Sequence, residues 1–161
     1  MDLKRWSAKN FPAMLLMALM ALTGLAGCTT PDYLDGNGNL TIPVAKVSEK
    51  AVFYPLEVEG VKMEVLAVKA PDGTIRTAFN TCQVCYSSGR GYYKQEQNAL
   101  VCQNCGNRFT MEQVEVISGG CNPVPILPEY KTQDGENIVI SGELLRAAKD
   151  IFSNWQTFSK A

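Results

Sequence analysis

Histidine is absent from all 161 residues of the chain. Without an imidazole there can be no Ser-His-Asp triad, no Cys-His nucleophile pair, no His-ligated zinc, copper or haem, and no true Rieske centre, which needs two histidines. The sequence also lacks a cluster of lysine and arginine, and its net charge is −1, so it has no electrostatic footprint for a nucleic-acid partner. Any bound metal must therefore be held by sulfur or oxygen.

Long apolar runs are confined to one segment near the N-terminus. Residues 11–26 are rich in Leu, Met and Ala and follow three basic residues, Lys4, Arg5 and Lys9, a pattern typical of a secretory signal peptide over residues 1–27. The segment ends in Leu-Ala-Gly before Cys28 and resembles a bacterial lipobox. We expect cleavage there, lipidation of Cys28, and a protein anchored to the membrane in the bacterial cell envelope, on the extracytoplasmic side. The alternative is an uncleaved membrane helix, for which the run is short.

The chain after the predicted signal peptide divides into a tether and one domain. Cleavage removes three basic residues and one acidic residue and changes the net charge from −1 to −3. Residues 28–39 are rich in Asp, Gly and Asn and lack apolar periodicity, which predicts a flexible tether. Residues 40–161 are sufficient for one hydrophobic core, so we expect a single β-rich metal-binding domain.

Short apolar stretches broken by turn residues predict antiparallel strands at 40–47, 51–58, 61–68, 74–79 and 138–140. In residues 61–68 apolar and other residues alternate with a period of two that weakens toward the end. From Ser141 onward, apolar residues recur at helical spacing and predict one amphipathic helix packed on the sheet. The expected fold is therefore mainly β, a small antiparallel sandwich or barrel with a C-terminal helix.

Two C-x-x-C pairs carry the chemistry, Cys82 with Cys85 and Cys102 with Cys105, and 16 residues separate them. This spacing allows two tight turns to bring four sulfurs to one tetrahedral point. Two disulfides are the alternative, because an exported protein lies in an oxidising compartment. A disulfide within C-x-x-C closes a very small loop and constrains the unfolded chain little. Zinc and iron–sulfur sites share all-thiolate ligation, so the spacing does not separate them.

Several neighbours of the cysteines are candidates for supporting roles. Gly106 follows the second pair, where the lack of a Cβ leaves room for backbone N–H groups to turn toward sulfur. Phe109 is placed to cover the site and Tyr92 lies in the intervening loop, although core packing is the simpler interpretation for each. Cys121 lies in the Gly-Gly-Cys-Asn-Pro loop at 119–123. Its thiol could reach the metal, face a partner, or be buried and inert.

The two cysteine pairs together with the Gly-Gly-Cys-Asn-Pro loop resemble the FtrD-like family of membrane-associated iron–sulfur proteins, over about residues 50–128. The resemblance implies an extracytoplasmic redox protein linked to iron-uptake systems with a high-affinity permease. It also implies that the cluster ligands are Cys82, Cys85, Cys102 and Cys105, with Cys121 a fifth cysteine of unassigned role. Family members commonly carry a multi-helix membrane portion, in place of which we expect only the lipid anchor.

The order of the predicted parts is also similar to that of a Rieske-type domain, with cysteine where Rieske proteins use histidine. This resemblance implies two cluster-binding hairpins set on the small β-sandwich or barrel. The leading hypothesis is an electron carrier that performs no bond-making on a substrate. One alternative is a zinc-stabilised lipoprotein that binds a partner or a metal. The other is a thiol–disulfide oxidoreductase, although catalytic C-x-x-C thiols usually lie at a helix N-terminus in a βαβ setting.

Overall fold

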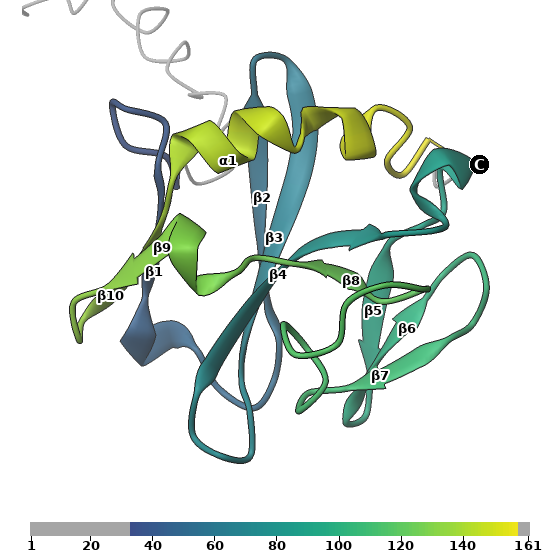
Figure 1. Ribbon diagram of the computed structural model, residues 1–161, viewed down its shortest axis with the longest axis horizontal. Coiled ribbons are helices and arrows are strands. Elements are labelled where there is room, and N and C mark those ends of the chain that lie inside the picture. Colours follow the sequence, from purple (N-terminus) through teal and green to yellow (C-terminus); the bar gives the residue numbers. More distant parts are fainter. Residues whose placement is uncertain (1–32, 158–161) are drawn as a thin grey trace, which may run out of the picture.

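The computed structural model describes residues 33–157 (Figure 1). The predicted signal peptide at 1–27, the predicted lipidation site Cys28 and the beginning of the predicted tether lie outside the described residues. Residues 33–39 of the predicted tether lie against the domain. Tyr33 packs edge-on against Tyr54, with ring centroids 5.2 Å apart, and the side chain of Asn39 accepts a hydrogen bond from the N–H of Gly142 at 2.8 Å.

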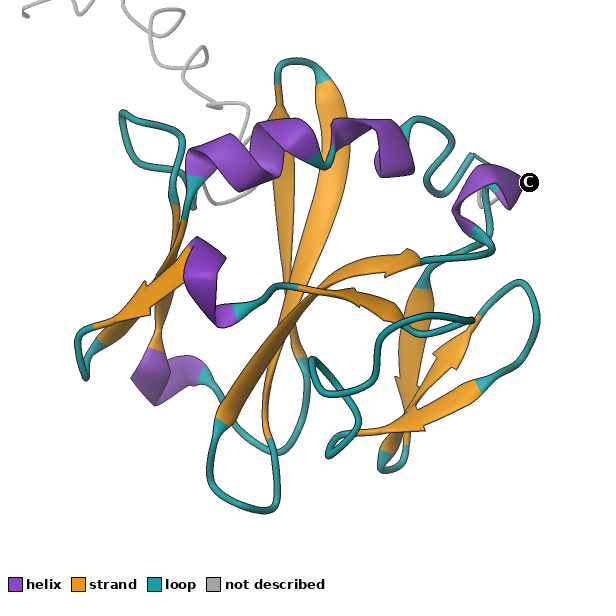
Figure 2. Cartoon of the chain, viewed as in Figure 1, coloured by secondary structure: helices purple, strands orange, loops and turns teal. Residues whose placement is uncertain are grey.

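The described chain is mainly β, and all of its strand pairs are antiparallel (Figure 2). The first sheet has the order β1-β10-β9, with β1 at Leu40–Pro43, β10 at Asn137–Ile140 and β9 at Lys131–Gln133. The second has the order β2-β3-β4-β8, at Val52–Val58, Val61–Lys69, Ile75–Cys82 and Pro123–Pro125. The third has the order β5-β6-β7, at Tyr93–Glu96, Ala99–Cys102 and Arg108–Thr110.

The predicted fold class is confirmed as a mainly antiparallel β structure with a C-terminal helix. Within residues 33–157 the strands form three sheets and no closed barrel. The one α-helix among the described residues, α1, spans Gly142–Ala147, and the same part of the chain contains four short 3-10 helices: η1 at Val44–Lys46, η2 at Tyr86–Ser88, η3 at Pro128–Tyr130 and η4 at Lys149–Phe152. The predicted strand at 40–47 ends at Pro43, where η1 follows, and the predicted strand at 74–79 continues to Cys82.

The central strand β3 separates two hydrophobic clusters. Met63, Val65 and Ala67 face the first cluster, which packs the sheet against α1 and η4. Leu66 and Val68 face the second cluster, which contains Cys82, Cys85 and Cys102. Burial on both faces explains why the period-of-two pattern weakens toward the end of this strand.

The C-terminal helix begins where the sequence predicts it. The Ser141 side chain accepts a hydrogen bond from the N–H of Leu144 at 3.2 Å, which caps the first turn. The α-helix ends at Ala147, earlier than the apolar spacing indicates, and η4 continues in the same direction across β2 and β3 (Figure 1). Leu145 and Phe152 are buried in the first cluster, and Phe152 packs edge-on against Phe79 at 5.8 Å between ring centroids. This packing confirms the predicted position of the helical segment on the sheet.

Candidate metal centre

The first cysteine pair lies at the end of β4, the strand that delivers Cys82 into the second cluster. The turn that follows folds back on the chain at Gly91, whose carbonyl accepts a hydrogen bond from the N–H of Cys82 at 2.6 Å. A Cβ at position 91 would lie 2.3 Å from the carbonyl oxygen of Cys85. Only glycine permits this approach, so Gly91 fixes how closely the first turn packs on the following loop.

The second pair forms the turn of the β6–β7 hairpin. Cys102 ends β6, its N–H donates to the carbonyl of Asn107 at 2.9 Å, and its carbonyl accepts from the N–H of Gly106 at 2.9 Å. Gly106 has a φ of 75°, and a Cβ there would meet nothing within 4 Å. Gly106 thus supplies a left-handed backbone conformation, which a residue without a Cβ adopts readily, and the N–H of the next residue, Asn107, donates to the Cys105 sulfur, as the sequence led us to expect.

The two turns present backbone N–H groups to sulfur in the same way. The N–H groups of Val84 and Cys85 donate to the Cys82 sulfur, the second of them at 3.3 Å. In the second turn, the N–H groups two and three residues after Cys102 make the equivalent contacts with its sulfur. Such donors stabilise negative charge on sulfur, which is the form that binds a metal.

A third loop brings Cys121 to the same place. Gly119 and Gly120 adopt left-handed conformations, with φ values of 84° and 73°. The loop is fastened to the first turn on both sides of Cys121, because the N–H of Gly119 donates to the Gln83 side chain at 2.6 Å and the N–H of Gln83 donates to the Asn122 carbonyl at 3.2 Å. The position of the Cys121 backbone is thereby fixed relative to the first turn.

All five described cysteines are free thiols, and their sulfurs converge. The sulfurs of Cys82, Cys85 and Cys102 lie within 4.8 Å of one another, as do those of Cys85, Cys105 and Cys121. We call these groups the inner triad and the outer triad. The residues of the inner triad are 0%, 7% and 1% exposed, whereas Cys105 is exposed and Cys121 half-buried. The structure thus brings together the four cysteines predicted as ligands and the fifth cysteine, whose role the sequence leaves open.

The thiols influence each other's ionisation. A hydrogen bond between the sulfurs of Cys82 and Cys102 lowers the pKa of Cys82 and raises the pKa of Cys102. Burial raises the pKa of Cys85. A hydrogen bond to Cys105 raises the pKa of Cys121 to about 12. The proton that Cys102 donates stabilises the Cys82 thiolate beside it, and the thiols whose pKa values are raised, Cys85, Cys102 and Cys121, release their protons when they bind a cation.

Aromatic and amide side chains that the sequence did not single out support the first turn. The buried Tyr93 donates its hydroxyl to the carbonyl of Cys121 at 2.7 Å, and its N–H donates to Asn80 Oδ1 at 2.8 Å. Asn80 in turn donates to Glu64 at 2.6 Å. Their sequence signal is weak, because an isolated Asn or Tyr in a strand does not reveal its partner. Phe109 packs edge-on against Tyr93 at 6.2 Å, so it belongs to the core around the thiols, as its packing interpretation predicts.

Tyr92 lies on the other side of the same loop. Its ring packs edge-on against Trp155 at 6.4 Å between centroids, and the indole N–H of Trp155 donates to the carbonyl of Asn80 at 2.8 Å. Tyr92 therefore joins the loop to the C-terminal segment. The packing interpretation holds for this residue too.

The segments that carry the thiols contain no charged residue. This is true of residues 77–89, 97–107 and 116–128, which together supply the five described cysteines. Apolar side chains are exposed on these segments, Val84 at 58% and Val116 at 64%. The sulfurs thus lie in apolar surroundings on the inner side and reach an uncharged surface on the outer side.

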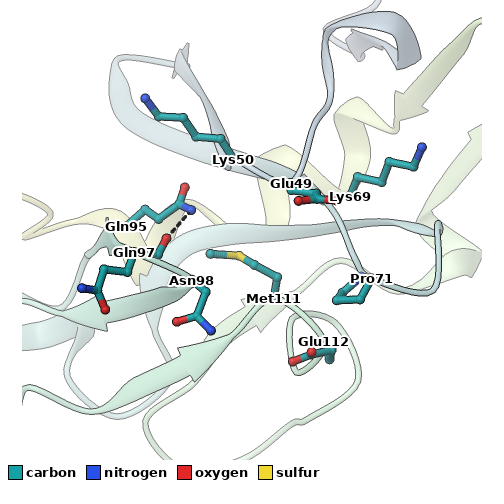
Figure 3. A pocket seen from close by; sticks show the side chains of 9 residues that line it. All are labelled: Glu49, Lys50, Lys69, Pro71, Gln95, Gln97, Asn98, Met111 and Glu112. Atoms are coloured by element: carbon teal, nitrogen blue, oxygen red, sulfur yellow. Dashed lines mark hydrogen bonds between the residues drawn. The ribbon is translucent and has the colours of Figure 1, made fainter.

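A separate groove of about 520 Å³ lies at the opposite end of the β5–β6 hairpin (Figure 3). Gln95, Gln97 and Asn98 line one side, and Met111 points into it. The strand register places Tyr93 opposite Cys102 and Glu96 opposite Ala99, so the Gln97–Asn98 turn is the end of the hairpin remote from the thiols. No cysteine lines this groove.

The donor set fits a metal that prefers sulfur. The converging thiols supply soft ligands, and backbone N–H groups are aimed at two of the sulfurs. Zinc and iron in iron–sulfur clusters are both held by such thiolate sets. Cys82, Cys85, Cys102, Cys105 and Cys121 are the residues positioned to hold it.

A family model described as membrane iron-sulfur containing protein, FtrD-like, matches residues 47–152. No curated protein and no solved structure matches the chain. Among residues 33–157, no helix has the length and apolar character that crossing a membrane requires.

Proposed function

This chain belongs to the FtrD-like family of membrane iron–sulfur proteins, and we propose on that basis that it is an extracytoplasmic, lipid-anchored electron carrier that serves an iron-uptake system. The observation that carries the proposal is the convergence of two C-x-x-C turns, with N–H groups aimed at the first sulfur of each. An iron centre bound by these thiolates supplies one-electron chemistry, with a potential set by N–H···S bonds, burial and charge.

The surroundings of the thiols suit a carrier. The second hydrophobic cluster covers the inner triad and excludes water from it. Cys105 is exposed, so a redox partner can approach the outer edge of the site without rearrangement of the domain. The absence of charge on residues 77–89, 97–107 and 116–128 supports a partner with an uncharged contact surface. In this proposal the chain holds and insulates the centre and acts on no substrate of its own.

The remaining parts of the proposal concern location and partners. Residues 1–27 would direct export, Cys28 would carry the lipid, and residues 40–161 would form the single metal-binding domain. An iron permease or its redox partner would receive or supply the electron. The membrane description of the family supports attachment to a membrane.

Zinc in the same thiolate set is the second candidate, since the donor chemistry suits both metals. The thiol–disulfide oxidoreductase hypothesis has less support. Residues after Cys85 form the three-residue η2, and those after Cys105 lead into β7, so neither pair lies at the start of an α-helix that would activate a thiol.

Anaerobic purification followed by iron, zinc and sulfide assays tests the proposal. We expect brown protein that contains iron and acid-labile sulfide, absorbs visible light that dithionite bleaches, and gives an electron paramagnetic resonance signal in one oxidation state. Colourless protein with stoichiometric zinc would contradict the electron-carrier function and support the zinc module. Colourless protein without metal and with oxidised cysteines would contradict both.

The anchor is tested separately. Cys28→Ser is expected to abolish incorporation of labelled palmitate. The variant protein should either leave the membrane fraction or keep its uncleaved signal peptide. Cys121→Ser, which also removes one thiol, is the matched control and should stay membrane-bound and labelled. Labelling of the Cys28→Ser protein would contradict the lipidation site.

A further inference from the structure

The five sulfurs form two groups of three that have the Cys85 sulfur in common. Cys85 belongs to both triads, Cys82 and Cys102 complete the inner one, and Cys105 and Cys121 complete the outer one. Neither triad contains all four cysteines of the two C-x-x-C turns. A single metal bound tetrahedrally by four thiolates, with metal–sulfur bonds of about 2.3 Å, requires all four sulfurs within about 3.8 Å of one another. The sulfurs of each triad lie within 4.8 Å of one another, whereas the four sulfurs of the two C-x-x-C turns form no such group, so two positions need smaller shifts of the sulfurs than one four-sulfur site.

We propose that the thiols form two adjacent metal positions that share Cys85, an inner position in the inner triad and an outer position in the outer triad. This inference rests on the proposed function in one respect, that the cysteines bind a thiophilic metal. It goes further in assigning Cys121 as a ligand and in fixing the number of metal positions. Two positions that share a thiolate suit two thiophilic ions.

The distances allow an ion at each position. Three sulfurs around one ion at about 2.3 Å lie about 4.0 Å apart when the arrangement is planar. Both triads have all sulfurs within 4.8 Å, so shifts of less than an ångström per sulfur complete either position. A thiolate sulfur has more than one lone pair, which allows Cys85 to contact both ions. Binding replaces the thiol protons, including the proton that Cys102 shares with Cys82.

The Cys121 backbone is held in place for this role. The Tyr93 hydroxyl donates to its carbonyl, and the flanking residues Gly119 and Asn122 bond the first turn through Gln83. Asn122 is itself buried, and its side chain donates to the carbonyls of Ile117 and Pro123. These hydrogen bonds hold the backbone on both sides of Cys121. A metal ligand needs such a fixed position, whereas a thiol that only meets a partner protein does not.

The two positions differ in access to solvent. The inner triad is buried throughout, whereas the outer triad contains the exposed Cys105 and the half-buried Cys121. An ion at the outer position therefore exchanges with added metal or a chelator before an ion at the inner position. The outer position is also the one that an approaching partner meets first.

Cadmium loading measures the number of positions. Full-length protein in a Cys28→Ser background is incubated anaerobically with excess Cd²⁺ and a thiol reductant, desalted, and measured by native mass spectrometry and elemental analysis. We expect two Cd²⁺ per chain, one of which a mild chelator removes rapidly. Cys121→Ser and Cys105→Ser are each expected to hold one Cd²⁺, and Ser118→Ala, an exposed control in the same loop, should hold two.

The outcomes separate this inference from the proposed function. One Cd²⁺ in the parent protein, unchanged in Cys121→Ser, would overturn the second position and leave a single metal site intact. No Cd²⁺ in the parent protein would contradict the metal-binding function itself. Circular dichroism of each variant shows whether it is folded, and the parent stoichiometry tests the inference even if a variant is not. Two Cd²⁺ retained in both Cys121→Ser and Cys105→Ser would also overturn it.

Discussion

The two C-x-x-C turns share one local geometry and differ in their surroundings. In each, a strand delivers the first cysteine, and the backbone N–H groups two and three residues later turn toward its sulfur. The first turn is buried beneath loops that return at Gly91 and at Asn122, so Cys82 and Cys85 are both covered. The second turn is the tip of a hairpin, and Cys105 is exposed. The motif fixes the local backbone, whereas the segments packed over it decide which sulfur is accessible.

The same contrast explains why one turn depends on many partners and the other on few. Tyr93, Asn80 and Gln83 fasten the first turn to β5, β3 and the loop at 117–122. The second turn is held mainly by its own hairpin and by a hydrogen bond from the N–H of Gln103 to the carbonyl of Tyr92 at 2.8 Å. Substitutions that disturb the packing over the first turn should therefore affect more of the domain than substitutions at the exposed end of the second turn, at Cys105.

The largest expected effect comes from removal of a buried ligand. Cys102→Ala should abolish metal binding at the inner position and lower the free energy of unfolding by several kcal/mol, because the free energy of ligation is part of the free energy of folding. Cys105→Ala, at the exposed end of the same turn, should retain part of the metal and most of the stability. Metal analysis and chemical denaturation check both variants. An unchanged metal content in Cys102→Ala would contradict the assignment of the buried thiols.

The second-largest loss of stability is expected from substitution of Gly91, with Gly106 as the comparison. Gly91→Ala places a Cβ 2.3 Å from a backbone oxygen of Cys85 that cannot move aside, and should cost at least about 3 kcal/mol, at the upper end of overpacking effects. Gly106→Ala meets no neighbour and costs only the left-handed conformation, about 1–2 kcal/mol. Denaturation midpoints in urea measure the difference. Equal losses of stability in the two variants would show that close packing at Gly91 does not distinguish the first turn from the second.

A smaller effect is expected from one hydroxyl. Tyr93→Phe removes the hydrogen bond to the Cys121 carbonyl and should destabilise the protein by about 1 kcal/mol while the ring stays packed on Phe109. Tyr92→Phe is the matched control, because the contact that places Tyr92 is between its ring and Trp155. Thermal unfolding compares the two variants. A larger loss in Tyr92→Phe would reverse the roles assigned to these tyrosines.

The smallest effect is a pH dependence beside the first turn. Burial raises the pKa of Glu64, and the hydrogen bond from Asn80 opposes this only in part. The Glu64 carboxyl therefore holds its proton more tightly in the folded state than in the unfolded state. Its contribution to the free energy of unfolding is fully present below the unfolded pKa of about 4.3 and is lost as the pH rises through the folded pKa. Glu64→Gln keeps an acceptor for Asn80 and removes the charge.

The variant should therefore gain stability relative to the parent protein at pH 7, and the gain should disappear below pH 4, where both side chains are uncharged. Denaturation at a series of pH values measures the difference between the two proteins. Glu57→Gln, which removes an exposed carboxylate from the adjacent β2, is the control for loss of charge alone. A gain for Glu64→Gln that persists at low pH would exclude ionisation as its cause.

Much of the scaffold can be predicted from local pattern. The strands β2, β3 and β4 begin within a residue of their predicted positions, and Ser141 caps the C-terminal helix as its sequence indicates. The sequence pattern did not predict where a strand or helix ends when its surroundings change along its length. The strand at residue 40 ends early at Pro43, and the helix after Ala147 tightens into a 3-10 turn. The short strands β8 and β9 have no periodicity of their own, and β8 depends on pairing with the distant strand β4.

The sequence alone determined the chemistry of this protein: it has no imidazole, two C-x-x-C turns and a fifth cysteine between turn-forming residues, so that a metal bound by these cysteines must be a thiophilic one. The tertiary structure decided how the thiols are grouped, which are buried, and that Cys121 meets Cys85 and Cys105. The physical reason is that backbone turns are fixed by neighbouring residues, whereas the approach of Cys121 to the first turn depends on hydrogen bonds between residues far apart in the sequence, such as that between Gly119 and Gln83, which are 36 positions apart.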